Sequence, residues 1–207
     1  DEMFQKVNAD YQQISTHPEF SGLTFIDGNL ILQNIEISGR VNSFSEQGLL
    51  QLNQSTLKGK HVFSYWIQHC FLCALEKIEF CEFYYKDQYK KVKLASLPVL
   101  TKQQAIEIML QLVDGFNKGK NKALEFYVDT AYEYEKIVKA KDANSALEKI
   151  EALWQIDEYS TFYEAQDIYI KTSLKNSAHG AYNFSQEFFE NSALYMQPLV
   201  DRLEEKK

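Results

Sequence analysis

Hydrophobic and polar residues alternate along the stretch from Leu23 to Asn53, as they do in half-buried strands. The alternation breaks at Asp27-Gly28, at Ser38-Gly39 and at residues 46–48, where turn-forming residues gather. We therefore expect an antiparallel meander of about three strands. The three breaks are the places where the pattern predicts its turns.

The rest of the chain follows a helical period, apart from one further pair of strands. Apolar residues recur three or four positions apart in the helical stretches, and Thr101 is a suitable N-cap for a long amphipathic helix that includes Phe116. The aromatic-rich stretch from Ile78 to Leu94 reads as two strands with a turn at Lys86-Asp87. Further helices are predicted at residues 1–14, 60–77, 128–140, 142–154, 162–175 and 183–200.

The order of these elements predicts a mixed α/β (α+β) fold in a single domain, residues 1–207. Residues 1–100 would hold the sheet and residues 101–207 would be mainly helical, since no Pro/Gly/Ser-rich linker divides the chain. An apolar fraction of 45% with only 3 Pro and 8 Gly is typical of a globular protein.

No apolar run is long enough to cross a membrane, because polar residues interrupt the most hydrophobic stretch, from Val62 to Leu75. The chain starts at Asp1 without a signal-peptide pattern, which suggests a segment of a longer protein. Three cysteines, Cys70, Cys73 and Cys81, lie in apolar surroundings and are odd in number, which favours a reducing compartment. We therefore expect a cytoplasmic location.

The negative charge is confined to the second part of the chain. Residues 1–122 carry 13 acidic and 13 basic side chains, whereas residues 123–207 carry 16 acidic and 9 basic ones. An acidic surface repels phosphate, so contact with a DNA backbone would fall to local lysine clusters. Solvated surface is the commoner role of such clusters, but Tyr84, Tyr85 and Tyr89 beside the first cluster are able to stack on bases. The candidates are Lys86, Lys90, Lys91 and Lys93, and then Lys118, Lys120 and Lys122.

Two strand segments, Gly39-Arg40-Val41-Asn42 and residues 48–55, resemble the metal-binding strands of the nuclease domains in RecB-like proteins. Residues 66–74, residues 110–116 and the C-terminal helices resemble the C-terminal domain of RecC, the gamma chain of exodeoxyribonuclease V in the RecBCD complex. This resemblance implies a degenerate PD-(D/E)xK core, the restriction-endonuclease-like fold, with the order α-β-β-β-α-β and extra C-terminal helices.

The same resemblance implies that the nuclease chemistry has been lost. The positions of the two acidic metal ligands and the lysine read Asn42, Asn53 and Ser55, which carry no charge to hold Mg²⁺ or to orient an attacking water. The only pairs with an acidic residue two positions before a lysine are Glu204/Lys206 and Glu205/Lys207, in a polar tail that we expect to fray. We therefore expect neither catalysis nor a bound metal or other cofactor.

By resemblance, the chain would be a non-catalytic scaffold and DNA strand guide in double-strand-break repair by homologous recombination. RecB-like and RecD-like subunits would be its partners and would supply the motors, with DNA bound non-specifically and no membrane contact. Two alternatives remain. One is a nuclease with ligands from other positions, such as Asp27, Glu36 and Glu79. The other is a protein-interaction module that never touches DNA.

Two further motifs have plainer interpretations than the chemistry they suggest. His69 and Cys73 lie four apart beside Cys70, but zinc sites usually need a second ligand pair, so core residues with a hydrogen-bonded histidine are favoured. The stretch from Gly115 to Lys120 resembles a phosphate-binding loop with a residue too few. It is better explained as a helix C-terminus with Gly119 as a possible cap.

Overall fold

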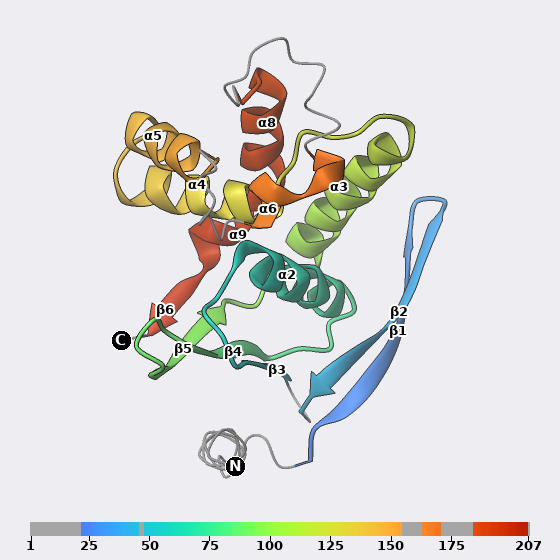
Figure 1. Ribbon diagram of the computed structural model, residues 1–207. Coiled ribbons are helices and arrows are strands. Elements are labelled where there is room, and N and C mark those ends of the chain that lie inside the picture. Colours follow the sequence, from blue (N-terminus) through green and yellow to red (C-terminus); the bar gives the residue numbers. More distant parts are fainter. Residues whose placement is uncertain (1–21, 46–47, 155–162, 171–183, 207) are drawn as a thin grey trace. The chain divides into compact units, whose positions relative to one another are not determined.

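The computed structural model describes residues 22–45, 48–154, 163–170 and 184–206 of the chain (Figure 1). Two compact units share them: the first comprises Asp1–Thr56, Ile67–Glu107 and Glu204–Lys207, and the second comprises Leu57–Trp66 and Ile108–Leu203. The helix predicted at residues 1–14 and much of the one at 162–175 lie outside the described residues. A single domain over the whole chain stays a prediction.

The first unit is built on a six-stranded mixed sheet whose strands follow one another in chain order. All neighbouring strands are antiparallel except β3 and β4, which are parallel. A parallel pair needs a crossover connection, and helix α2 (Gly59–Ala74) supplies it. The expected α+β fold, its three-stranded meander and its later strand pair are thus confirmed. The strands are β1 (Thr24–Leu32), β2 (Ile35–Phe44), β3 (Gly48–Asn53), β4 (Phe80–Lys86), β5 (Val92–Leu97) and β6 (Glu204–Lys206).

The first two predicted turns are wrong, because both glycines lie inside strands. Gly28 of β1 pairs directly with Gly39 of β2, and the hairpin turns instead at Gln33-Asn34, where Gln33 has a φ of 53°. Glycine is needed at position 28 because neighbouring side chains pack against the backbone there, and not because the chain turns. A Cβ at this position would lie 2.5 Å from Leu75 Cδ1 and 2.8 Å from the ring of Phe71, both from the end of the α2 segment.

The C-terminal residues form a strand, so the expectation of a frayed tail is wrong. Strand β6 pairs with β5, which would otherwise present an open edge. Side-chain contacts help to hold it: Tyr85 Oη donates to Glu205 Oε2 at 3.1 Å, and Lys206 Nζ lies 2.9 Å from Glu82 Oε1. Charged residues have low strand propensity, which is why the sequence pattern gave no sign of this strand.

Helix α3 (Lys102–Asn121) begins as predicted at Thr101. The Gln104 N–H donates to Thr101 Oγ1 at 3.3 Å, and Gln104 Oε1 accepts from the Thr101 N–H at 3.1 Å. This reciprocal capping box satisfies two backbone donors at the helix start. The remaining helical elements are α4 (Val128–Ala140), α5 (Ala143–Trp154), α6 (Tyr163–Gln166), α8 (Gln186–Asn191), the π-helix η2 (Ser192–Met196) and α9 (Gln197–Arg202).

The second unit has an aromatic core with a buried polar chain at its centre. The ring of Tyr127 lies 5.0 Å from that of Trp154 and 5.8 Å from that of Phe188, centroid to centroid. Trp154 Nε1 donates to Thr130 Oγ1 at 2.9 Å, and the same hydroxyl donates to Glu164 Oε2 at 2.7 Å. Glu164 also accepts the backbone N–H groups of the first turn of α4, so it caps that helix.

The paired glycines of the hairpin give a matched test of this packing. Gly28→Ala should lower the free energy of unfolding by about 1–3 kcal/mol, because the added methyl overlaps Phe71 and Leu75. Gly39→Ala is the control, since a Cβ at this position meets no atom within 4 Å, and its effect should stay within about 0.5 kcal/mol. Urea unfolding of both variants measures the difference. Equal losses would contradict the packing role of Gly28.

Candidate functional site

Asn53 and Ser55, which the sequence resemblance matches to nuclease positions, form a small neutral turn at the end of β3. Asn53 ends the strand, and its Oδ1 accepts from the Ser55 N–H at 3.0 Å and from Ser55 Oγ at 2.9 Å. The amide oxygen of Asn53 is thus engaged with the residue two positions further along. Neither side chain carries a charge to hold a divalent cation.

Asn42 lies on β2, in a part of that strand that is not paired with β3. It is exposed on β2 and pairs with Phe25 of β1, while β2 and β3 share only the pair Phe44 and Leu49. Beyond that pair, the strand that β3 pairs with in the sheet is β4, with Asn53 opposite Tyr85. The register therefore gives Asn42 and Asn53 different partner strands.

The acidic residues considered as alternative ligands are engaged or spread out. Asp27 makes a bidentate pair with Arg40, with oxygen-to-nitrogen distances of 2.8 and 2.9 Å, and this hydrogen bonding lowers the pKa of the Asp27 carboxyl. Glu36 accepts from Asn29 Nδ2 at 2.7 Å across the same hairpin, whereas Glu79 precedes β4. Within the described ranges, no three His, Cys, Asp or Glu side chains gather closely enough to hold a metal ion.

His69 is a hydrogen-bonded core residue, as the sequence favoured. Its side chain is fully buried and Nε2 donates to the carbonyl of Pro98 at 3.0 Å. Cys73 Sγ lies 3.5 Å from the same nitrogen. Burial lowers the pKa of His69 to about 4, with the hydrogen bond to Pro98 opposing the shift in part.

The three cysteines are buried and none forms a disulfide. Burial raises the pKa of the Cys73 thiol to about 11, and burial likewise places the pKa of the Cys81 thiol well above its usual value. Thiolates bind metals and attack disulfides, whereas protonated thiols do neither well. These cysteines therefore behave as small apolar residues of the core.

The stretch from Gly115 to Lys120 is continuous helix, so Gly119 does not cap α3, which runs on to Asn121. The glycine at 115 has a packing reason, because a Cβ would meet Tyr195 Oη at 2.7 Å. The likeness to a phosphate-binding loop thus comes from helix packing. Capping at Gly119 was predicted from residue type alone, and a glycine inside a helix looks the same in sequence.

The lysines at the end of α3 are committed to contacts within the chain. Lys118 Nζ lies 2.7 Å from Asp114 Oδ2, and Lys120 Nζ lies 5.0 Å from the ring centroid of Phe116. Lys122 Nζ lies 2.5 Å from Glu187 Oε2 on α8. Each cation therefore already has a partner, and a phosphate would have to compete for it.

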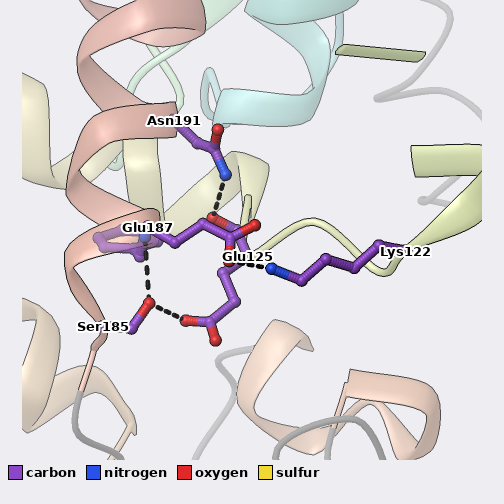
Figure 2. A network of polar contacts seen from close by, with 6 residues as sticks. Lys122, Glu125, Ser185, Glu187 and Asn191 are labelled. Atoms are coloured by element: carbon purple, nitrogen blue, oxygen red, sulfur yellow. Dashed lines mark hydrogen bonds and ion pairs between the residues drawn. The ribbon is translucent and has the colours of Figure 1, made fainter. Parts of the chain in front are cut away.

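Figure 2 shows that the contact of Lys122 belongs to a network between the segment after α3 and α8. Ser185 caps α8 by accepting the Phe188 N–H, and its Oγ donates to Glu125 Oε2 at 2.5 Å. Asn191 Nδ2 donates to the carbonyl of Glu125 at 3.2 Å. Lys122 thus helps to hold α8, which is a structural role.

The first lysine cluster lies at the turn between β4 and β5 and is differently placed. Lys90 and Lys91 are exposed, and neither forms an ion pair with any residue that the structure describes. Lys86 and Lys93 are half-buried on the flanking strands. With Asp87 as the one acidic residue, residues 86–93 carry four positive charges and one negative charge, a net of +3.

The tyrosines beside this cluster divide into one exposed ring and two that are covered. Tyr89 is 73% exposed at the turn, Tyr84 is half-buried, and Tyr85 is only 8% exposed. The hydroxyl of Tyr85 is bound to Glu205, and burial together with this carboxylate raises the pKa of Tyr85 to about 12. The expectation that Tyr85 is able to stack on a base is therefore wrong, and Tyr89 is the ring in position to do so.

Asp87 fixes the shape of this turn, a feature that sequence analysis missed. Its Oδ1 accepts the N–H groups of Tyr89 at 2.8 Å and Lys91 at 2.9 Å. Its backbone also exchanges hydrogen bonds with Lys90 and Lys91 at 2.9 Å each. Aspartate at the start of a turn often binds backbone groups two or more residues on, which is the signal that was available.

The described part of the chain contains no helix that is both long and apolar enough to span a membrane. A family model for the RecC C-terminal domain matches residues 1–137. The comparison with curated proteins gives no match. The matched range contains the sheet strands β1 to β5, helices α2 and α3, both lysine clusters and most of α4.

The buried histidine predicts a pH dependence of stability. Between pH 6.5 and about 4, the unfolded chain binds a proton on residue 69 that the folded chain does not. Stability is therefore lost as the pH falls through this window, by up to about 3 kcal/mol from this group. In His69→Gln, which keeps an N–H donor for Pro98, the loss from pH 7 to pH 4 should shrink by that amount. Urea unfolding across this range measures it, and identical pH profiles would contradict the assignment.

Proposed function

Since the chain belongs to the RecC C-terminal domain family, we propose that it is a non-catalytic domain that scaffolds a RecBCD-type complex and guides a DNA strand through it. The family suggests the role of a RecC-type subunit in that exodeoxyribonuclease complex. The processes in which this complex would act are DNA repair and recombination. The lack of catalysis, the scaffold and the strand guide are our proposals.

The charge of the nuclease-like positions is the observation that carries the non-catalytic role. Asn42, Asn53 and Ser55 replace two carboxylates and one ammonium by neutral groups. Mg²⁺ loses its hydration shell reluctantly and needs anionic oxygens in return, and the developing negative charge of phosphodiester cleavage needs a cation. The hydrogen bonds between Asn53 and Ser55 support the same conclusion, because they occupy the amide oxygen locally.

A sheet without its metal site still offers a rigid surface for other subunits. Strands β3 and β4 and the crossover helix contribute large side chains that are completely buried, such as Leu49, Phe83 and Leu72. A core of this kind holds surface groups in fixed positions, which a scaffold requires. We propose RecB-like and RecD-like subunits as the partners and the cytoplasm as the location.

For the DNA contact, the turn between β4 and β5 is favoured over the end of α3. Lys90 and Lys91 are exposed without an ion-pair partner among the described residues, whereas Lys118 and Lys122 are bound to carboxylates. Unpaired lysines release counterions from DNA without first breaking an ion pair. We therefore propose residues 86–93 as the contact, and the lysines of α3 as structural residues.

The two alternatives make different demands on the chain. A nuclease with ligands from Asp27, Glu36 and Glu79 would have to break the bidentate contact of Asp27 with Arg40 and bring distant carboxylates together. An interaction module without DNA contact would leave the net charge of +3 at residues 86–93 without a role. The experiments below separate these possibilities from our proposal.

The first prediction concerns cleavage. The full-length subunit, purified without its partners, should leave a labelled DNA single strand intact in Mg²⁺ or Mn²⁺, because its nuclease-like positions are neutral. Asp27→Ala should make no difference, and gel analysis of the strand measures both. Metal-dependent cleavage that Asp27→Ala abolishes would overturn the non-catalytic role and support the alternative nuclease.

The second prediction concerns charge. Lys90→Glu/Lys91→Glu in the assembled complex should weaken single-strand binding, and the slope of log K against log salt should become shallower by about 0.7 for each lost phosphate contact. Lys118→Glu/Lys120→Glu is the matched control, with the same change in charge at lysines that have intramolecular partners. Fluorescence anisotropy over a salt series measures both. An unchanged affinity and slope for the first variant would favour the module without DNA contact.

A further inference from the structure

We propose that Tyr89 at the β4–β5 turn stacks on an unpaired base, so that this turn binds single-stranded rather than duplex DNA. The inference rests on the proposed strand-guide function and adds the residue by which this turn distinguishes a single strand from a duplex. It starts from three observations: the exposed ring, the closed turn and the backbone conformation of Lys90.

The ring of Tyr89 is presented to solvent by a turn that has little freedom left. Of its side chain and backbone, 73% is exposed, while its N–H is held by Asp87 Oδ1 at 2.8 Å. The N–H groups of Lys90 and Lys91 are bound to the carbonyl and the carboxylate of Asp87, respectively, at 2.9 Å each. A ligand that binds here orders little backbone, so less of the contact energy is lost to entropy.

Lys90 occupies a backbone conformation that favours glycine. Its φ is 63°, in the left-handed region where a Cβ crowds the backbone. Glycine at this position would relieve that strain, so the lysine side chain is kept at a cost in stability. Strained residues of this kind are concentrated at binding sites. Here the strained residue is also a cation next to the exposed ring.

The aromatic ring of Tyr89 with the two lysines that follow it matches the chemistry of single-stranded DNA. Each nucleotide of a single strand offers an aromatic face and a phosphate within the reach of neighbouring side chains, and stacking tolerates any base. In a duplex the base faces are covered by their neighbours, so only the phosphates remain available. An acidic segment of a partner protein would match the lysines but would leave the ring without a stacking partner.

A second aspartate and tyrosine pair of the chain provides an unusually close control. The N–H of Tyr169 is held by Asp167 Oδ1 at 2.8 Å, the same contact as between Asp87 and Tyr89. Tyr169 is 83% exposed, and isoleucines flank it on both sides. Substituting each tyrosine therefore compares two similarly held rings, of which only Tyr89 has a lysine directly next to it in the sequence.

The experiment uses the assembled complex and DNA with a single-stranded tail that carries the fluorescent base 2-aminopurine. In Tyr89→Leu, tail binding should weaken roughly 5- to 100-fold and the quenching of 2-aminopurine should be lost, since stacking is removed. The salt slope should stay unchanged. The tail affinity of Tyr169→Leu should stay within about twofold of that of the unsubstituted complex. The affinity of Tyr89→Leu for a blunt duplex should also stay within about twofold, because neither measurement probes this stacking contact.

Lys90→Gly separates charge from folding. It removes a cation but suits a φ of 63°, so the melting temperature should hold or rise while tail affinity falls and the salt slope becomes shallower. If Lys90→Gly weakens binding but Tyr89→Leu leaves affinity and quenching unchanged, the stacking inference fails and the strand guide stands. If both variants bind the tail normally, the proposed DNA contact fails as well. If Tyr89→Leu disrupts subunit assembly instead, the turn binds protein and the inference is overturned.

Discussion

The parallel pairing of β3 with β4 is the constraint on which the first unit depends. Two parallel strands cannot be joined by a tight turn, so the chain must leave the sheet and return through a helix. Helix α2 makes that crossing, and it contributes residues to both compact units. Its later part buries His69, Cys70 and Cys73 and supplies the ring of Phe71 against which Gly28 packs. The low pKa of His69, the raised pKa of the Cys73 thiol and a glycine that makes no turn thus all follow from this one pairing of strands.

Element types followed from the hydrophobic pattern, while contacts between distant residues did not. The α2 and α3 helices, the first meander and the Thr101 cap were predictable because period and capping are local properties. Gly28 was misread as a turn because a glycine required by a distant neighbour, here Phe71, looks like any other in the sequence. A Cβ at Gly39 would meet no atom within 4 Å, so Gly39 was misread from its residue type alone. Strand β6 was missed for a related reason. Its three charged residues pair because β5 has an open edge, and no local preference records that edge.

The candidate site shows the same division. That Asn42, Asn53 and Ser55 are neutral can be read from the sequence, since the identity of a side chain decides whether it bears charge. Their equivalence to the metal-binding positions of a nuclease stays a prediction. The two lysine clusters could not be ranked, because sequence does not disclose that Lys122 reaches Glu187 65 positions away. Tyr85 and Tyr89 were likewise equivalent until the sheet placed one ring in the interior and left the other outside. Partner choice, rather than residue type, distinguishes a binding group from a structural one.

Strand β6 has a consequence for how the protein is made on the ribosome. The sheet begins near residue 24 but receives its last strand from residues 204–206, after the entire second unit has been synthesised. Domains tend to fold as their residues emerge, from the N-terminus onwards. While residues 108–203 are translated, the edge of β5 therefore stays unpaired, and other nascent chains or a chaperone are able to bind it. The first unit, whose strands are synthesised first, can therefore complete its sheet only after the second unit has been synthesised.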